Sequence, residues 1–258
     1  VLRGDWSTQS LAGAGGRLHI YNSRYQVTRL YYYLAGGLFA FATSLSTLLE
    51  NLPAPRVLRK PSIAAFLDTG FSKTERTQLE KIHRLLPTAS IHLEEDEVRV
   101  SSHWRGEYRF HRRPFDDLEQ KVSAYEGVYR GGIANFLDAA RPTEVGCLLS
   151  GGHDTSYTLL QAARVFERPI HTFTAACAGS PHDESPKAGY VSEQCGAIHH
   201  RVEVGPPSLD LIPRMVSATE EPVSGSSLPI YCCAAEASKY VDAVIAGDAG
   251  DTLWGEYY

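Results

Sequence analysis

The chain contains few of the residues that mark specialised classes of protein. Its 258 residues include one methionine and five cysteines, too few cysteines for the disulfide framework of a small secreted protein. No two cysteines have the spacing of a zinc or redox motif, and those at 147, 177 and 232–233 lie in apolar runs. We therefore expect reduced thiols and a cytoplasmic protein.

An excess of positive charge is also absent. The chain has 25 lysines and arginines against 30 aspartates and glutamates, which gives a net charge of -5, whereas binding to nucleic acid requires a basic surface. The basic cluster RGEYRFHRR at 105–113 is interpreted as a solvated face. We therefore expect small-molecule partners and no nucleic acid.

Long hydrophobic runs are limited to one uncharged stretch, LYYYLAGGLFAFATSLSTLL at 30–49. Its length is close to the ~20 residues that cross a bilayer, but Ala35-Gly36-Gly37 interrupts it between two runs of β-favouring residues. The pattern predicts a buried hairpin, followed by a helix that begins at Thr43 or Ser44. We expect no signal peptide and no membrane partner.

The sequence also lacks a methionine at its start, since its one methionine is Met215. We therefore expect the chain to be a processed protein or a piece of a longer one. The last residues, GDTLWGEYY, follow directly on a turn motif, so a truncated carboxyl end is expected as well.

Two regions of different texture follow each other along the chain. Residues 1–112 are β-rich, with a strand predicted at 17–23 and hairpins at 30–44 and 89–105. Two further segments, SIAAFLDTG at 62–70 and KTERTQLEKIHRLL at 73–86, are predicted as short helices.

From residue 113 onward helical and strand-like patterns alternate. A helical pattern at 114–140, broken by Gly131-Gly132, comes first. Strands are then expected at 144–150, 169–177, 198–204 and 241–250, and helices at 155–166, 184–196, 208–220 and 227–240. This alternation predicts an α/β fold with a doubly wound, mostly parallel sheet, in which ligands bind beyond the carboxyl ends of the strands.

The first candidate site is the turn SGGHD, which joins the first of these strands to the next helix. Gly151 and Gly152 lack a Cβ, so the backbone N–H groups of the turn can close around an anion. The helix that follows directs its positive end at the same place, and Ser150 adds a hydroxyl. The turn is therefore predicted to bind phosphate.

Asp154 is the unusual residue in such an anion site. A carboxylate repels phosphate unless a cation lies between them, and Mg2+ takes one or two carboxylates together with phosphate oxygens. The turn is not a Walker A loop, because no Gly-Lys-Ser/Thr follows, and it lacks the GxGxxG of a dinucleotide site. The alternative is a tight turn in which Asp154 merely caps the helix.

A second turn of small residues, AVIAGDAGD, places Asp248 and Asp251 just beyond a buried strand. Two carboxylate-bearing turns at strand ends of one sheet could hold a metal–pyrophosphate unit between them. A plain strand-to-helix turn with Asp as the cap is the alternative here too, but the coincidence of two such turns favours a ligand site.

These motifs resemble those of a known family. LLSGGHDTS at 148–156 is similar to the SGGxDS PP-loop of ATP pyrophosphatases, and residues 115–258 resemble the synthetase domain of the asparagine synthetases in four ordered motifs. The other three are SPHDESPKAGYVSEQCGAIHHRVEV, EEPVSGSSLPIY and AGDAGDTLWGEYY. The resemblance implies a PP-loop, adenine nucleotide α-hydrolase-like fold.

The front of the chain resembles, more weakly, the latter part of the family's glutaminase domain, through residues 18–49. The implied organisation is a partial glutaminase-like domain of N-terminal-nucleophile type at 1–112 and an asparagine synthetase-like ATP-binding domain at 113–258. The family's glutaminase uses an amino-terminal cysteine, which Val1 does not supply, and YNSRYQ replaces an Arg-Asp-containing turn. We therefore expect this chain not to form a glutamine thioester.

The resemblance also implies roles for individual residues. The family binds ATP and Mg2+, activates aspartate as an acyl-adenylate with release of pyrophosphate, and lets ammonia from glutamine attack. Asp248 matches a catalytic position that assists amine attack, and Asp154 and Asp251 match the two metal-binding carboxylates. The implied ATP- and pyrophosphate-binding residues are Leu148, Leu149, Ser150, Gly151, Gly152, Asp154, Thr155, Ser156, Gly247 and Gly250.

Departures from the family's pattern leave alternatives open. Thr155 replaces a Ser of the first motif, Ala246, Ala249, Thr252 and Glu256 replace Ser, Gly, Glu and Gly of the last, and a later lysine would lie beyond Tyr258. The first hypothesis is an asparagine synthetase-type amide ligase, with a homodimer left open. The alternatives are a cyclase of β-lactam or lasso-peptide type and a non-catalytic family member, and the net charge disfavours a tRNA-modifying enzyme.

Overall fold

The structure is a computed structural model that describes residues 6–12, 17–22, 29–52, 56–72, 74–94, 97–104, 118–177, 179–181, 183–205, 209–248 and 250. The chain divides into two compact units. The first comprises Val1–His111 and Val216–Ser224, and the second comprises Arg112–Met215 and Gly225–Tyr258. A short segment of the rear half therefore belongs to the front unit, which the sequence did not lead us to expect.

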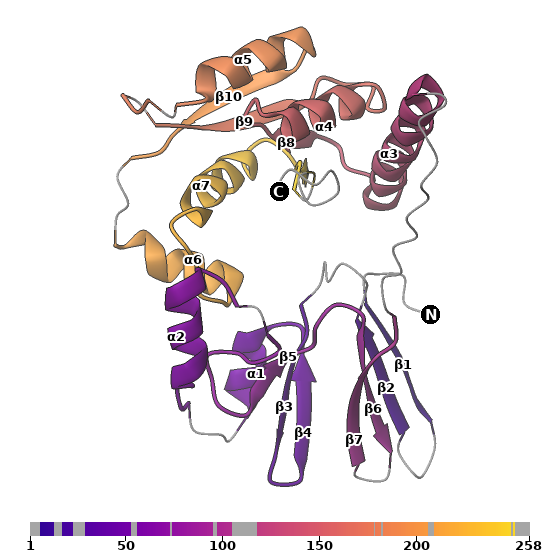
Figure 1. Ribbon diagram of the computed structural model, residues 1–258, viewed down its shortest axis with the longest axis vertical. Coiled ribbons are helices and arrows are strands. Elements are labelled where there is room, and N and C mark those ends of the chain that lie inside the picture. Colours follow the sequence, from indigo (N-terminus) through magenta and orange to yellow (C-terminus); the bar gives the residue numbers. More distant parts are fainter. Residues whose placement is uncertain are drawn as a thin grey trace. The chain divides into compact units, whose positions relative to one another are not determined.

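The first unit contains two antiparallel sheets, with the strand orders β1-β2-β6-β7 and β4-β3-β5 (Figure 1). The strands are β1 Trp6–Ala12, β2 Arg17–Asn22, β3 Tyr31–Ala35, β4 Leu38–Ala42, β5 Ile82–Arg84, β6 Ala89–Glu94 and β7 Glu97–Ser102. Ile20 and Ile91 face each other across β2 and β6 and are fully buried. β2 and β6 thus each contribute apolar side chains to the core, and these cross-strand pairs stabilise the sheet.

The uncharged run at 30–49 forms the hairpin and helix that the sequence predicts. β3 and β4 pair across a turn in which Gly36 and Gly37 have φ angles of 60° and 75°, a conformation that favours glycine and matches the twist of a hairpin. Helix α1 (Leu45–Asn51) begins after Ser44, whose side chain accepts a hydrogen bond from the backbone N–H of Thr47.

The helix predicted at 73–86 is wrong. Over residues 74–86 the chain forms bends, isolated bridges and the short strand β5, whereas helix α2 (Lys60–Thr69) forms where a helix was predicted. β5 pairs with β3 and buries Ile82 in the core, and Lys81 has a φ of 64°, which an α-helix does not allow. Pairing with β3 therefore overrides the helical spacing of the sequence.

The second unit contains one sheet of four parallel strands in the order β10-β9-β8-β11. The direction of strand addition reverses at β8, which has β9 on one side and β11 on the other. The strands are β8 Val145–Leu148, β9 His171–Ala176, β10 Ile198–Glu203 and β11 Ala243–Ile245, and the helices are α3 Leu118–Ala140, α4 His153–Ala163, α5 Ser185–Gln194 and α7 Ser227–Ala237. Helix α6, Leu211–Thr219, begins in this unit, and its residues from Val216 onward belong to the first.

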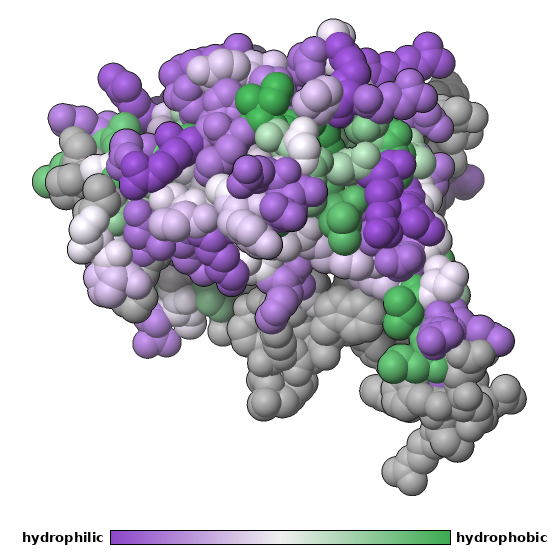
Figure 2. All heavy atoms as spheres, turned by 90° about the horizontal axis from the view of Figure 1, so that it is seen from above, coloured by the Kyte–Doolittle hydropathy of each residue, from purple (hydrophilic) through white to green (hydrophobic). Residues whose placement is uncertain are grey.

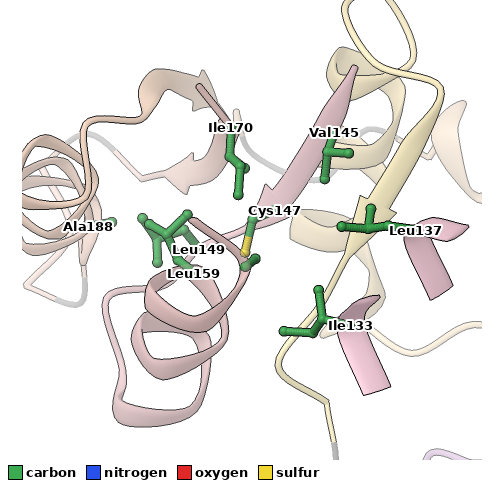
Figure 3. Packing of buried hydrophobic residues seen from close by; sticks show 9 residues of the cluster. Ile133, Leu137, Val145, Cys147, Leu149, Leu159, Ile170 and Ala188 are labelled. Atoms are coloured by element: carbon green, nitrogen blue, oxygen red, sulfur yellow. The ribbon is translucent and has the colours of Figure 1, made fainter. Parts of the chain in front are cut away.

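Helices cover both faces of this sheet. On one face α3, α4 and α5 enclose a core around Cys147, Leu149 and Leu159 (Figure 3). On the other face α7 packs on the strands, with Phe173 buried against Cys233. The unit is therefore the doubly wound α/β layer that the sequence predicts, and each large apolar side chain buried in it contributes about 1.5–3 kcal/mol.

The break predicted at Gly131-Gly132 does not occur, since α3 runs without interruption from Leu118 to Ala140. Ile133 and Leu137 lie one turn apart on this helix and are buried in the core. Packing of this face stabilises the helix across two glycines that each disfavour it by about 1 kcal/mol.

None of the helices formed by the described residues combines the length and the hydrophobicity needed to cross a bilayer. The face shown in Figure 2 is mostly hydrophilic, with apolar side chains in small groups. All five cysteines lie in the described part of the chain and are unpaired, whereas the whole basic cluster at 105–113 and the tip of the hairpin at 95–96 lie outside it.

Candidate functional site

A cavity of about 320 Å3 lies at the carboxyl ends of β8, β9 and β11. Parallel α/β sheets bind ligands at this edge, next to the point where the strand order reverses. The cavity is lined by Leu148, Leu149, Ser150, Thr155, Phe173, Thr174, Ala175, Cys177, Glu184, Pro229, Ile230, Cys233, Ala246, Gly247 and Asp248. Both turns singled out in the sequence therefore contribute to it.

The turn after β8 is shaped by close contact with helix α5. Gly151 has a φ of 77°, and a Cβ at this position would lie 2.9 Å from the backbone nitrogen of Ala188 and 3.1 Å from the Lys187 side chain. Glycine is therefore required here both by the backbone conformation and by the space available.

A polar cluster holds the start of α5 in this place. The Arg201 guanidinium donates to the Ser185 hydroxyl at 2.9 Å and lies 3.3 Å from the Asp183 carboxylate, which accepts from the Ser185 N–H at 3.0 Å. The hydrogen bonds from Ser185 lower the pKa of the Asp183 carboxyl below its usual range, and the nearby Arg201 lowers it to a smaller extent. The charge on Asp183 thus persists at neutral pH and fixes the helix that supports Gly151.

The hydroxyl groups of the first turn hydrogen-bond to one another and to the backbone. The Gly152 N–H donates to Ser150 Oγ at 3.1 Å, the Ser150 N–H donates to Thr155 Oγ1 at 3.2 Å, and the two hydroxyls lie 3.0 Å apart. Helix α4 starts after Gly152, which has no side chain to cap it. A helix amino end without a side-chain cap is a favourable place for an anion.

Ser156 has a polar atom that the protein does not satisfy. Its Oγ is buried and has no hydrogen-bond partner among the residues that the structure describes. A buried hydroxyl without a partner is costly and uncommon in native proteins. An oxygen-rich ligand or a water molecule bound at the start of α4 would supply the missing partner.

The second turn packs directly on the first. A Cβ at Gly247 would lie 2.9 Å from the backbone nitrogen and Cα of Thr155, and one at Gly250 would collide with the Asp154 carboxylate. β11 and β8 pair in parallel, with Ile245 opposite Cys147, which brings the two turns to the same edge of the sheet. Asp154 therefore lies at the junction of the two turns.

Asp242 anchors the start of β11 at the other end of this pairing. Its carboxylate accepts hydrogen bonds from the backbone N–H groups of Thr143 at 2.8 Å and Glu144 at 3.0 Å. These hydrogen bonds hold the pKa of Asp242 below its usual range. They set the register of β11 against β8, and with it the position of the second turn.

The predicted metal pair is described only in part. Asp154 lies between the turns, and Asp248 is exposed and lines the cavity. Asp251 and Ala249 lie outside the described residues. Within the described part of the chain, no three His, Cys, Asp or Glu side chains are grouped as metal ligands, so the magnesium site stays a prediction.

Several cavity residues were not singled out in the sequence. Phe173, Thr174 and Cys177 come from the end of β9, Glu184 precedes α5, and Pro229, Ile230 and Cys233 come from α7. The sequence indicates only that these residues follow a parallel strand or lie near the start of a helix. Many other residues have such positions, so the sequence alone does not identify these as lining the cavity. Burial raises the pKa of the Cys233 thiol to about 11, so this residue is a neutral wall of the cavity.

Comparison with known proteins finds a family model that is similar to residues 139–258. They match the model of the asparagine synthase family. A putative glutamine-hydrolysing asparagine synthetase of Methanocaldococcus jannaschii is 24% identical over 99% of this chain and 50% of its own length. A putative glutamine-hydrolysing asparagine synthetase of Mycobacterium tuberculosis is 34% identical over 55% of this chain and 22% of its own.

The chain thus spans about half the length of the first relative. Among solved structures, the NH3-dependent NAD synthetase of Campylobacter jejuni is similar, with a TM-score of 0.38 and 14% identity over 54% of this chain and 60% of its own. The resemblance to the asparagine synthetases that the motifs indicate is confirmed at low sequence identity.

Proposed function

We propose, from the asparagine synthase domain at 139–258, that the complete protein forms an amide bond through an acyl-adenylate. ATP would activate a carboxylic acid with release of pyrophosphate, and an amine would then displace AMP. The observation that carries this proposal is the contact of the two turns, which puts Asp154 against Gly250 beside a cavity at the strand ends.

The residues present fit a nucleotide with its phosphates at the two turns. The cavity has apolar walls from Leu148, Leu149 and Phe173, which suit a base, and it continues to the hydroxyls of Ser150 and Thr155. The uncapped start of α4 and the unpartnered Ser156 hydroxyl supply hydrogen-bond donors for phosphate oxygens.

The residues also fit a magnesium ion bound with that nucleotide. The Asp154 carboxylate lies in a turn that is suited to bind phosphate, and the two negative charges repel each other. A hard cation bound between them removes this repulsion. When bound, the ion neutralises charge on the departing pyrophosphate. Asp154 and Asp251 would hold it, and the backbone N–H groups of the first turn would stabilise negative charge as the α–β bond of ATP breaks.

The identity of the acid and the amine is a finer part of the proposal. Asparagine formation from aspartate with glutamine-derived ammonia is the first candidate, because the relatives at 24% and 34% identity carry that name. In this proposal Asp248 assists attack of the amine from the cavity wall, the first unit is part of a glutaminase-like domain, and the protein works in the reducing cytoplasm.

Closure of a ring by an amine of the same molecule is a second candidate. The charged side chains among the described residues that line the cavity are Glu184 and Asp248, both acidic. Two carboxylates favour a substrate that carries an ammonium group near the activated acid. The two candidates differ in one observable, since only the first requires added ammonia or glutamine.

The first prediction concerns Asp154. Wild-type full-length protein incubated with ATP, Mg2+ and aspartate, or a panel of amino-substituted acids, is expected to release pyrophosphate. Asp154→Asn is expected to reduce release by about 10³-fold or more at an unchanged melting temperature. Asp210→Asn, a change on the α6 side of the unit, serves as the matched control and is expected to leave release unchanged. Release of inorganic phosphate instead of pyrophosphate, or full activity of Asp154→Asn, contradicts the proposal.

A further inference from the structure

Residues 216–224 comprise the end of α6, from Val216 to Thr219, and the first part of the connection to α7. They lie in the rear half of the sequence but belong to the first unit. Two adjacent glutamates, Glu220 and Glu221, make their hydrogen bonds with residues of that unit. We refer to residues 216–224 as the docked segment. Its contacts are with residues more than a hundred positions away in the sequence, so folding, not chain proximity, brings them together.

Glu220 caps a helix to which it is not joined. Its carboxylate accepts hydrogen bonds from the backbone N–H groups of Leu45 at 2.6 Å and Ser46 at 3.0 Å, and from the Ser44 hydroxyl at 2.7 Å. Burial opposes its charge, but these hydrogen bonds outweigh burial and hold the pKa of the Glu220 carboxyl below its usual range. The amino end of α1 is thus satisfied by the docked segment.

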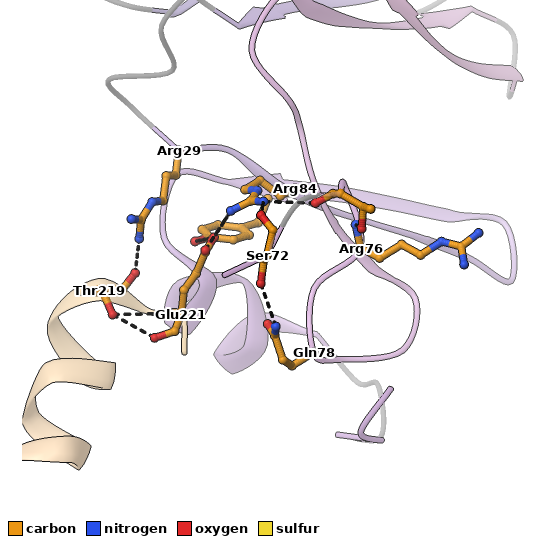
Figure 4. Close-up of polar contacts among 9 residues, drawn as sticks. Arg29, Ser72, Arg76, Gln78, Arg84, Thr219 and Glu221 are labelled. Atoms are coloured by element: carbon orange, nitrogen blue, oxygen red, sulfur yellow. Dashed lines mark hydrogen bonds and ion pairs between the residues drawn. The ribbon is translucent and has the colours of Figure 1, made fainter. Parts of the chain in front are cut away.

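Glu221 forms the second contact, a half-buried ion pair with Arg84 (Figure 4). The Arg84 Nη1 lies 2.9 Å and 2.8 Å from the two carboxylate oxygens, and the two side chains are 14% and 16% exposed. The Tyr31 hydroxyl donates to the same carboxylate at 3.0 Å. A pair this shielded from water is screened less than an exposed one and is costly to break on one side only.

Arg84 is also held in place by backbone groups that lie near it in the sequence. Its Nη2 donates to the backbone carbonyls of Ser72 at 3.0 Å and Thr74 at 3.1 Å. Arg29 adds a further contact by donating to the carbonyl of Thr219, where α6 ends. The guanidinium fork therefore joins a fixed loop on one side to the docked segment on the other.

The chain runs from this contact directly into the cavity wall. Glu221 precedes the first residue of α7, Ser227, by six positions. Pro229, Ile230 and Cys233 of α7 line the cavity at the strand ends. Whatever restrains residues 220–224 therefore restrains the amino-terminal turn of a helix that shapes the candidate nucleotide site.

We propose that Arg84 and Glu221 are positioning residues for the nucleotide site, with the front unit as the anchor for the start of α7. The predicted effect on the kinetics of pyrophosphate release rests on the proposed function, whereas the predicted effect on the hydrogen exchange of α7 does not. The inference gives the first unit a role in the reaction of the second unit, and this role does not depend on glutaminase chemistry.

The test compares Arg84→Gln with Arg76→Ala in the full-length protein. Arg76 is a neighbouring, exposed arginine whose ion pair is with Glu75, so its removal controls for loss of a positive charge on this surface. Hydrogen exchange of residues 225–233 in the ligand-free protein is expected to be about tenfold faster in Arg84→Gln and unchanged in Arg76→Ala. Glu221→Gln is expected to match Arg84→Gln.

A kinetic arm separates positioning from simple loss of structure. Arg84→Gln is expected to raise the KM for ATP in pyrophosphate release about tenfold with kcat within about threefold, and Arg84→Lys to recover part of the difference. Equal exchange in Arg84→Gln and Arg76→Ala overturns the inference. If Arg84→Gln does not fold, Arg84→Lys and Glu221→Asp supply the exchange comparison. Absence of pyrophosphate release in the wild type refutes the proposed function, while the exchange arm still decides this one.

Discussion

Gly151 and Gly250 are two residues at which the site leaves no room for a side chain. Gly151 meets the backbone of α5, and Gly250 meets the Asp154 carboxylate. The sequence could predict that glycines there serve a turn, because small residues after a strand are a local signal. It could not show which partner each glycine faces, because Ala188 is distant in sequence and packs there only in the folded unit.

Gly151→Ala and Gly179→Ala form a matched pair at this scale. Both glycines have nearly the same backbone, with φ of 77° and 79°, but a Cβ at Gly179 would have nothing within 4 Å. The backbone strain common to both is about 1–2 kcal/mol, and the contact with Ala188 is expected to destabilise Gly151→Ala by about 1–3 kcal/mol more. Urea unfolding measures the difference, and equal midpoints would show that α5 does not press on the turn.

Elements of the second unit follow their sequence patterns more closely than those of the first. The strands β8 to β11 lie where apolar runs alternate with helical spacing, because a buried parallel strand is apolar on both faces. The helix predicted at 73–86 does not form, because residues 82–84 pair with β3 as strand β5. This pairing joins residues that are distant in the sequence, so local helical spacing does not predict it. The break predicted at the glycine pair of α3 does not form, because the packing of Ile133 and Leu137 in the core outweighs the low helix propensity of glycine.

Gly132→Ala tests this account of α3. A Cβ at Gly132 would have nothing within 4 Å, so alanine is expected to raise the free energy of unfolding by roughly 0.5–1 kcal/mol through helix propensity alone. The shift in the urea midpoint measures it. A loss of stability would instead mean that α3 requires flexibility at the glycine pair.

On the scale of the whole molecule, the candidate site draws on one unit only. The cavity and both turns come from the second unit, whereas the first unit contributes the anchor for residues 216–224. The sequence predicted the rear site from its motifs, since each motif is local. It did not predict the docked segment, because nothing in EEP alone distinguishes a site residue from one that binds a distant arginine.

Nucleotide binding is therefore expected to protect the two units unequally. ATP with Mg2+ at about a hundredfold above its Kd stabilises a folded site by about 2.7 kcal/mol, which calorimetry detects as a higher melting temperature. Hydrogen exchange is expected to slow at 148–156 and 246–248 and to remain unchanged at 17–22 and 89–94. Addition of EDTA in excess of Mg2+ is expected to remove most of the effect. Equal protection in both units would contradict a site confined to the second.

The pairing of β11 with β8 has a consequence for how the protein folds during its synthesis. The two strands lie about 100 residues apart in the chain, and contacts of such long range form late because loop closure must precede them. On the ribosome, the first turn emerges well before the turn that completes it. A nascent chain released before β11 would carry half of the proposed nucleotide site, so ATP is expected to stabilise the fold only once synthesis has passed residue 250.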